Sequence, residues 1–231
     1  MTTARLAKKQ RPGNVTVKSQ VLDAELVEMR REQIVAAAVY LFSKQGYYKT
    51  TIQEIARKAR ISVGLIYHYA RTKEDVLFLT LMSVLDSYKR EIPIVDPNDP
   101  PLLSLWKALN AYGRVIDRRR EAAVLAYRST KSLPTVQRRT IMHLEIETTE
   151  LLAQRVQACV AAGIFREIDV ELAVYQIIMH AHTWALKHWR LKELTTLDHY
   201  TKVGFDSFVR ASATPKGMLQ YEKFSKTAPG M

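Results

Sequence analysis

Side chains that can hydrogen-bond to nucleic acid are concentrated between Thr50 and Lys73, in the stretch TTIQEIARKARISVGLIYHYARTK. Hydroxyl, amide and imidazole groups can bond to base edges, whereas an ammonium group or free backbone N–H groups can bond to phosphate. Ser62 is expected to cap a short helix, so that the first backbone N–H groups of that helix would point at a phosphate. This stretch therefore predicts binding to double-stranded DNA rather than catalysis.

Two short helices must position these groups. In the first, apolar residues recur every three or four positions from Ile52 to Ala59, and Thr50 or Thr51 can cap its start. A second short helix is expected from Val63 to Tyr69, after the connection Arg60-Ile61-Ser62. A buried helix, a tight connection and a second helix with an exposed, hydrogen-bonding and aromatic face together indicate a helix-turn-helix.

The types and spacing of the residues around this stretch are similar to those of a known family. The matching residues are Ala37, Phe42, Gly46-Tyr47, Thr50-Thr51-Ile52, Ile55-Ala56, Ala59, Ile61-Ser62, Gly64, Ile66-Tyr67, Tyr69 and Thr72-Lys73-Glu74. With them, the chain from Arg31 to Leu79 resembles the DNA-binding domain of the TetR family of bacterial transcriptional regulators. Arg60 stands where that family usually has Gly, and it would carry backbone strain if its φ were positive. Ala70 stands where an aromatic residue is more common.

The resemblance implies which residues contact DNA. The corresponding positions here are Thr51, Gln53, Ser62, Gly64, Tyr67, His68, Tyr69 and Lys73. Lys73 and Tyr69 are expected to hold phosphates, whereas His68, Val63 and Gln53 are better placed to meet base edges or thymine methyl groups. An alternative interpretation of Tyr67 is partial burial against the first helix of the domain.

Composition and length limit the class of protein. The chain has 231 residues, of which 47% are hydrophobic, so it can bury a substantial core. It has no uncharged apolar run of membrane-spanning length and no apolar signal-peptide core, so neither feature is expected. The single cysteine, Cys159, fits a reducing cytoplasm. With 8 Gly, 8 Pro and long helix-compatible segments, the sequence predicts an all-α fold.

Positive charge is concentrated in the first part of the chain. The net charge is +12, and residues 1–90 carry 16 Lys and Arg against 8 Asp and Glu. Such an excess is expected where phosphates must be neutralised. Residues 1–22 are predicted to form a basic, disordered arm, which either adds DNA contacts beside the recognition helix or is a solvated tail.

The remaining chain divides into three parts. Residues 23–90 are predicted to hold the helix-turn-helix domain and a linking helix that Thr72 caps. Prolines between positions 93 and 101 end that helix. Residues 91–212 are predicted to form a helical ligand-binding and dimerisation domain, and residues 213–231 a mobile tail. The helices expected in this domain are about 99–114, 116–130, 134–162, 169–192 and 195–212.

The predicted helix 169–192 is apolar around most of its circumference. Such a helix is usually buried on more than one side, so one side can face its own domain and another a second subunit. In the resembling family the last two helices form a four-helix bundle across a two-fold axis. A homodimer of that kind presents two recognition helices to a palindromic operator.

Large and adaptable side chains in the second domain can line a pocket for a small molecule, with ordinary core packing as the alternative for each. The candidates are Trp106, Tyr112, Tyr127, Met142, His143, Phe165, Met179, His180 and Trp184. Their apolar area predicts a hydrophobic effector. The arginine runs at 118–120 and 138–139 either meet an anionic part of the ligand or form solvated helix faces.

A local resemblance gives the effector a possible class. The residues that carry it are Leu133-Pro134, Arg138-Arg139, Gly163-Ile164-Phe165-Arg166, Asp169, Leu172-Ala173, Trp184 and Trp189-Arg190. They resemble a subgroup of the family that senses acyl- and steroid-CoA thioesters. The resemblance implies an acyl-CoA effector.

Enzymatic motifs are incomplete. The pair His143 and Glu145 has the H-x-E spacing of zinc deaminases but no P-C-x-x-C partner, and His180 and His182 point to different sides of a helix. Neither a cofactor nor a metal is expected. We therefore predict a ligand-responsive, dimeric transcriptional repressor. The alternatives are a regulator of the same fold that is controlled by a protein partner or by no ligand, and a helical module that has lost DNA binding.

Overall fold

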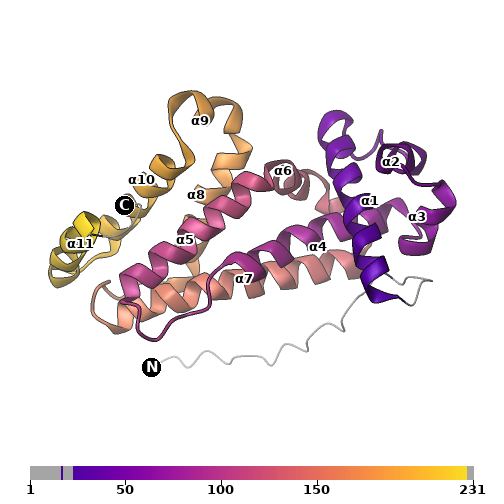
Figure 1. The fold of residues 1–231 in the computed structure, drawn as a ribbon. Coiled ribbons are helices and arrows are strands. Elements are labelled where there is room, and N and C mark those ends of the chain that lie inside the picture. Colours follow the sequence, from indigo (N-terminus) through magenta and orange to yellow (C-terminus); the bar gives the residue numbers. More distant parts are fainter. Residues whose placement is uncertain (1–16, 18–22, 228–231) are drawn as a thin grey trace.

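The computed structural model describes Val17 and residues 23–227, and within these residues every regular element is helical (Figure 1). The predicted all-α fold is confirmed. The arm predicted for residues 1–22 lies outside the described residues except at Val17. The first part of the chain contains α1 (Ala24–Gln45), α2 (Ile52–Ala59), α3 (Val63–Tyr69) and α4 (Lys73–Glu91). The second contains α5 (Pro101–Arg118), α6 (Arg120–Ser129), η1 (Thr130–Ser132), α7 (Thr135–Ala161), α8 (Val170–Leu186), α9 (His188–Leu194), α10 (Leu197–Ser212) and α11 (Pro215–Thr227).

Local side-chain caps explain where the first helices begin. Thr51 and Glu54 form a reciprocal capping box at α2, and Thr72 forms another with Asp75 at α4. Ser62 Oγ accepts a hydrogen bond from the Leu65 N–H at 3.1 Å and so caps α3. These caps fix where α2, α3 and α4 begin, and α1, α2 and α3 together form the three-helix head at the right of Figure 1.

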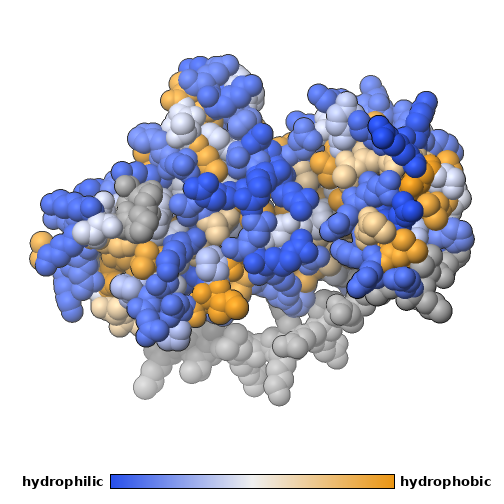
Figure 2. Space-filling model, viewed as in Figure 1, coloured by the Kyte–Doolittle hydropathy of each residue, from blue (hydrophilic) through white to orange (hydrophobic). Residues whose placement is uncertain are grey.

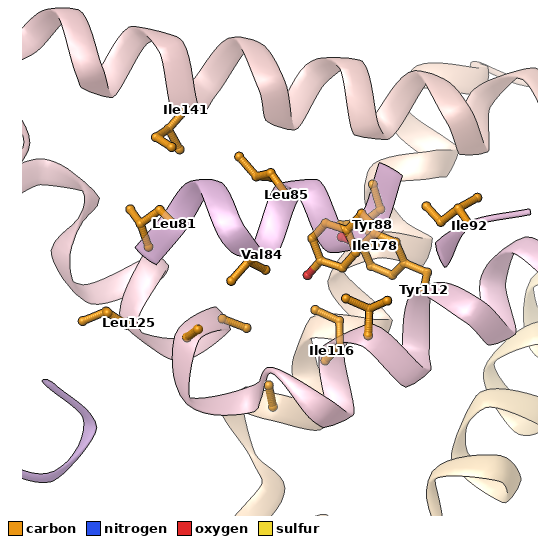
Figure 3. Packing of buried hydrophobic residues seen from close by; sticks show 14 of the residues in the cluster. Leu81, Val84, Leu85, Tyr88, Ile92, Tyr112, Ile116, Leu125, Ile141 and Ile178 are labelled. Carbon is orange, nitrogen blue, oxygen red and sulfur yellow. The ribbon is translucent and has the colours of Figure 1, made fainter. Parts of the chain in front are cut away.

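Helix α4 connects the head to the second domain. It packs against α1 and also against α5, α6 and α7. Figure 3 shows Leu81, Leu85 and Tyr88 of α4 in one core with Ile141 of α7 and Ile178 of α8. Three hydroxyls within this helix donate to carbonyls of the preceding turn, at 2.8 Å in each case: those of Thr80, Ser83 and Ser87. The same helix therefore belongs to the head and to the core of the second domain.

The second domain departs from the predicted helix boundaries in one place that matters for its shape. The single helix expected over residues 169–192 is two helices, since α8 ends at Leu186 and α9 begins at His188. Between them Lys187 leaves helical geometry, with φ −117° and ψ 20°, and its N–H still bonds to the Thr183 carbonyl at 2.8 Å. The other expected helices of this domain are present with boundaries shifted by a few residues.

The prediction that residues 213–231 form a mobile tail is wrong as far as Thr227, because residues 215–227 form α11. Thr214 Oγ1 donates to the Gly163 carbonyl at 2.8 Å, which holds the start of α11 against the turn after α7. Tyr221 is buried, and its hydroxyl donates to Asp206 Oδ1 of α10 at 2.9 Å. Tertiary contacts with α10 and the 163–165 turn therefore order a segment that lacks a clear apolar period.

The surface is mixed in character. Figure 2 shows a largely hydrophilic face over α9, with hydrophobic patches on the head and on the lower side of the second domain. No helix among residues 23–227 has the length and apolar character needed to span a bilayer.

Candidate nucleic-acid interface and internal cavity

The second helix of the helix-turn-helix, α3, separates its faces as the sequence predicted. Ile66 is fully buried, whereas Ser62, Gly64 and His68 are exposed. The Tyr67 side chain is 44% exposed, which favours an outward position over burial against α1. Val63 is partly buried at the edge of this face. On α2, Thr51 and Gln53 are also exposed, so seven of the nine predicted DNA-contact residues lie at least partly at the surface of α2 and α3.

The prediction that Tyr69 holds a phosphate is wrong. Its side chain is only 2% exposed and belongs to the core of the head. The reason is helical spacing, because Tyr69 follows the buried Ile66 by three residues and so lies on the same face of α3. Tyr69 supports the recognition helix from beneath.

Arg60 occupies the turn between α2 and α3 with φ 57° and ψ 42°. This is the left-handed region expected for the family's glycine, and for a residue with a Cβ it costs about 1 kcal/mol or more. The turn keeps its geometry because the N–H groups of Arg60 and Ile61 bond to carbonyls at the end of α2, at 3.2 and 3.0 Å.

Lys73 has a structural role that the sequence did not predict. Its Nζ lies 3.2 Å from the Tyr47 carbonyl oxygen, 3.3 Å from that of Tyr48 and 3.1 Å from that of Thr50. It also lies 4.5 Å from the centroid of the Tyr47 ring. All three ammonium protons therefore have acceptors in the connection between α1 and α2. Its contact with phosphate stays a prediction.

Replacing Lys73 by alanine separates these two roles. If Lys73 also neutralises a phosphate, Lys73→Ala should weaken binding on all DNA sequences and flatten the plot of log binding constant against log salt concentration by about one unit. If Lys73 only braces the α1–α2 connection, the variant should melt at a lower temperature with an unchanged slope. Lys44→Ala, an exposed lysine near the end of α1, is the control.

A cavity of about 310 Å³ that is partly open to solvent lies among α4, α5, α6, α7 and α8. Aliphatic side chains that Figure 3 labels, including Leu81, Val84, Leu85, Ile141 and Ile178, form much of its wall. Tyr112, Tyr127 and Met179, three of the predicted ligand-binding residues, line it as well. The cavity is therefore largely apolar, as the sequence predicted for a hydrophobic ligand.

Polar groups of the cavity form a small network around His182. Tyr112 Oη lies 2.7 Å from His182 Nε2, and the Tyr127 hydroxyl contacts Nδ1 of the same ring. Tyr88 stacks on Tyr112, with ring centroids 4.5 Å apart. Burial lowers the pKa of His182 to about 4, so the imidazole is neutral near pH 7. One hydroxyl then accepts a hydrogen bond from the ring and the other donates one to it.

The only acidic lining residue is Glu145, and no lysine or arginine lines the cavity within the described chain. Burial raises the pKa of the Glu145 carboxyl because the charged form is poorly solvated there. Tyr88, Glu145 and His182 were not predicted as site residues. Helical spacing could have found Glu145, which follows the cavity residue Ile141 by one turn of α7.

The other six predicted ligand-binding residues do not line this cavity. Trp106 packs on Phe205 at 5.1 Å and Phe165 on Phe208 at 5.6 Å between ring centroids, so both are core residues. On α7, Met142 is exposed and His143 Nε2 lies 3.1 Å from Glu147 Oε1 at the surface. The cavity takes its α7 residues from the side of the helix around Ile141 and Glu145, so that Met142 lies beside this side and His143 opposite to it. These four predictions are corrected.

His180 and Trp184 line a second hollow of about 340 Å³, which lies between α8 and α10. The His180 ring stacks on Tyr200 with centroids 4.2 Å apart, and the Tyr200 hydroxyl donates to the His180 carbonyl at 2.9 Å. The indole Nε1 of Trp184 donates to Asp117 Oδ1 at 2.7 Å. Both side chains thus hold α8 to its neighbours. The prediction that His180 and His182 point to different sides of the helix is confirmed.

Cys159 is a core residue. Its side chain is fully buried in α7, and burial raises the pKa of its thiol to about 12. The thiolate form that nucleophilic chemistry requires is therefore strongly disfavoured.

An exposed recognition helix on a three-helix head, joined by one long helix to a body with a largely apolar cavity, defines a helix-turn-helix transcriptional regulator. Residues 34–79 match the family described as bacterial regulatory proteins, tetR family, and residues 98–189 match the tetracyclin repressor-like C-terminal domain. The HTH-type transcriptional regulator HbdR of Aromatoleum sp. (strain CIB) is 45% identical over 217 residues, which cover 94% of this chain and 95% of HbdR. The chain belongs to the TetR family of transcriptional regulators.

Two further comparisons agree with this assignment. The HTH-type transcriptional repressor KstR2 of Mycolicibacterium smegmatis is 29% identical over 163 residues, or 69% of this chain and 78% of KstR2. The crystal structure of AibR in complex with isovaleryl coenzyme A and operator DNA superposes with a TM-score of 0.65 at 18% identity, over 76% of this chain and 96% of AibR. This second likeness is one of fold.

Proposed function

We propose that this protein is a dimeric repressor that leaves its operator when a hydrophobic effector, an acyl-CoA thioester, occupies the cavity among α4–α8. The observation that carries the proposal is the position of α4. Its first turn belongs to the head, and its later turns supply the cavity residues Leu81, Leu85 and Tyr88. A ligand that displaces those side chains would act directly on the helix that holds the head.

Exposure supports a set of DNA contacts on α2 and α3. We propose that Gln53, Val63 and His68 meet bases, and that the remaining exposed residues position the helix on the backbone. The remaining residues of this set are Thr51, Ser62, Gly64 and Tyr67. Tyr69 is omitted because it is buried.

Exposed apolar residues on α8 and α10 support dimerisation. Leu172 at the start of α8 is 61% exposed and Val203 on α10 is 48% exposed, and neither lines the cavity. We expect Leu172→Asp to yield a folded monomer, because a carboxylate would be buried in the contact with a second subunit. Leu219→Asp, an equally exposed position on α11, should remain a dimer. Sedimentation at micromolar concentration tests this, and a monomeric wild-type protein would contradict it.

The polarity of the cavity supports a neutral acyl group rather than a free acid. A carboxylate entering it would lose its hydration beside Glu145, and no lining cation among the described residues would compensate for that loss. The thioester carbonyl is uncharged and can accept a hydrogen bond from a tyrosine. A volume of about 310 Å³ suits an acyl group, with the nucleotide end outside. The complex of AibR with isovaleryl coenzyme A provides a protein of the same fold that binds a ligand of this class.

The test is release from DNA. Operator fragments would first be selected from genomic DNA, and acetyl-, isovaleryl- and octanoyl-CoA would then be titrated into the complex beside the matching free acids. We expect release by at least one thioester and by none of the acids, with tighter thioester binding to free protein than to the complex. Release by acids alone would contradict the CoA assignment. No release by either class would favour a regulator that a protein partner controls or that no ligand controls.

A further inference from the structure

One carboxylate joins α7 to the end of the recognition helix. Gln137, in the first turn of α7, donates from Nε2 to Asp75 Oδ1 at 2.7 Å. The other oxygen of Asp75 accepts the backbone N–H groups of Arg71 and Thr72 at 3.1 and 3.2 Å. These two residues form the turn between α3 and α4. Asp75 therefore bonds both to the start of α7 and to the turn that ends the recognition helix.

A second polar contact links the same region to the other side of the helix-turn-helix. Tyr48 Oη lies 2.8 Å from Ser132 Oγ, which is in η1, directly before α7. Tyr48 belongs to the α1–α2 connection, whose carbonyls hold Lys73. We call residues 130–137, which include η1 and the first turn of α7, the α7 corner. The α7 corner thus contacts the head at the connection before α2 and at the turn after α3.

The surroundings of the Gln137 amide favour one orientation, with its NH₂ group toward Asp75. Gln137 and Asp75 are both half-buried, and the Gln137 Oε1 atom is buried with no hydrogen-bond partner in the described chain. An amide turned the other way would place that oxygen against the Asp75 carboxylate. A hydrogen bond from an amide to a carboxylate at such a half-buried position is stronger than a hydrogen bond between two neutral groups. The Asp75 contact therefore fixes the orientation of the amide.

We infer that Gln137 is a positioning residue for DNA recognition, which sets the angle of α3 against the second domain through the carboxylate of Asp75. The α7 corner is also a boundary of the cavity, because Thr130 lines it from the corner and Ile141 lines it one turn beyond Gln137. A ligand that moved this wall would alter the same contact. That last step rests on the proposed function, whereas the positioning role does not.

The first test needs no ligand. Gln137→Glu would place two carboxylates where the structure has a 2.7 Å hydrogen bond. We expect its operator affinity to fall roughly tenfold, as for loss of a charge-assisted hydrogen bond. Affinity for unrelated DNA should change little, because phosphate contacts carry it. In Asp75→Asn/Gln137→Glu the asparagine amide can donate to the new carboxylate and its oxygen can accept from the backbone, so operator affinity should recover.

Lys89→Ala is the matched control. It removes the 2.7 Å contact between Lys89 and Glu147, which also joins α4 to α7 but far from the head, and it should leave operator affinity unchanged. Melting temperature and circular dichroism show whether each variant folds, and Gln137→Ala replaces Gln137→Glu if the latter does not. Wild-type operator affinity in the Gln137 variant would overturn the inference. Equal losses on operator and unrelated DNA, or no recovery in the double variant, would do so as well.

Octanoyl-CoA provides the second test. Gln137→Ala should bind this thioester as the wild type does, measured by calorimetry, but should show a smaller change in operator affinity on adding it. An unchanged ratio of operator affinities with and without the thioester would overturn the coupling role. Failure of octanoyl-CoA and its shorter homologues to bind the wild type would count against the proposed function, while the DNA-affinity result would still decide the positioning role.

Discussion

Replacing His182 by glutamine should make the fold much less sensitive to acid between about pH 6.5 and 4. Burial lowers the pKa of His182 from 6.5 to about 4, so in this window the unfolded chain binds a proton that the folded chain excludes. The contribution of the neutral ring is therefore complete above pH 6.5 and is lost as the pH falls toward 4. At roughly 1.4 kcal/mol per pH unit, the loss approaches about 3 kcal/mol. A glutamine can replace both tyrosine contacts without titrating.

The measurement is urea unfolding of wild type and His182→Gln at several pH values from 7.5 to 4.5. His199→Gln, which alters an exposed histidine in the first turn of α10, is the control and should follow the wild type. Glu145 has the opposite trend, because its raised pKa makes its contribution fall as the pH rises. It is present in all three proteins, so the difference between curves reports the histidine. Parallel curves for wild type and His182→Gln would refute the prediction.

Gly217→Ala should detach α11 from the body of the protein. A Cβ at this position would lie 1.9 Å from the Ile164 carbonyl oxygen, and the clash is with backbone rather than with a movable side chain. The α11 start cannot shift freely, because Thr214 donates both its N–H and its hydroxyl to this turn. We expect a loss of about 1–3 kcal/mol in the free energy of unfolding, as for other overpacked sites.

Gly113→Ala is the matched control for this substitution. Its added Cβ would lie 3.3 Å from the Thr201 hydroxyl, which can adjust, so its effect should stay within about 1 kcal/mol. Limited trypsin digestion locates the change, since local unfolding of α11 should make cleavage after the exposed Lys223 faster in Gly217→Ala before the rest of the chain unfolds. Equal stability and equal digestion of the two variants would show that α11 is not held at Gly217.

The head could be predicted from sequence because its determinants are local. Thr51, Ser62 and Thr72 each cap a helix within three residues of the group they bond, and Arg60 could be placed in the turn by spacing alone. The prediction for Tyr69 was wrong because the resemblance assigned a DNA contact to its position in the motif. Its spacing of three residues from Ile66 places it on the buried face of α3 instead.

The cavity depends on which faces of five helices meet, and the sequence does not state this. Met142 and Ile141 are neighbours in the chain, yet only Ile141 reaches the cavity. Phe165 has the right chemistry but belongs to the turn that holds α11. The break at Lys187 has no glycine or proline to mark it, and the order of α11 comes from tertiary contacts. Each of these errors concerns a residue whose surroundings are set by contacts with segments far away in the sequence.

The three back-bonded hydroxyls of α4 have a mechanical consequence. A serine or threonine that donates to a carbonyl of the preceding turn tends to bend its helix, and α4 has such bonds at Thr80, Ser83 and Ser87. Helix α4, which lies between the cavity and the head, is therefore expected to bend more easily than a helix without such bonds. If a ligand rotated the cavity end of α4, part of that rotation would bend the helix, and the head would rotate by a smaller angle. The same compliance would let the head tolerate small variations in the spacing of operator half-sites.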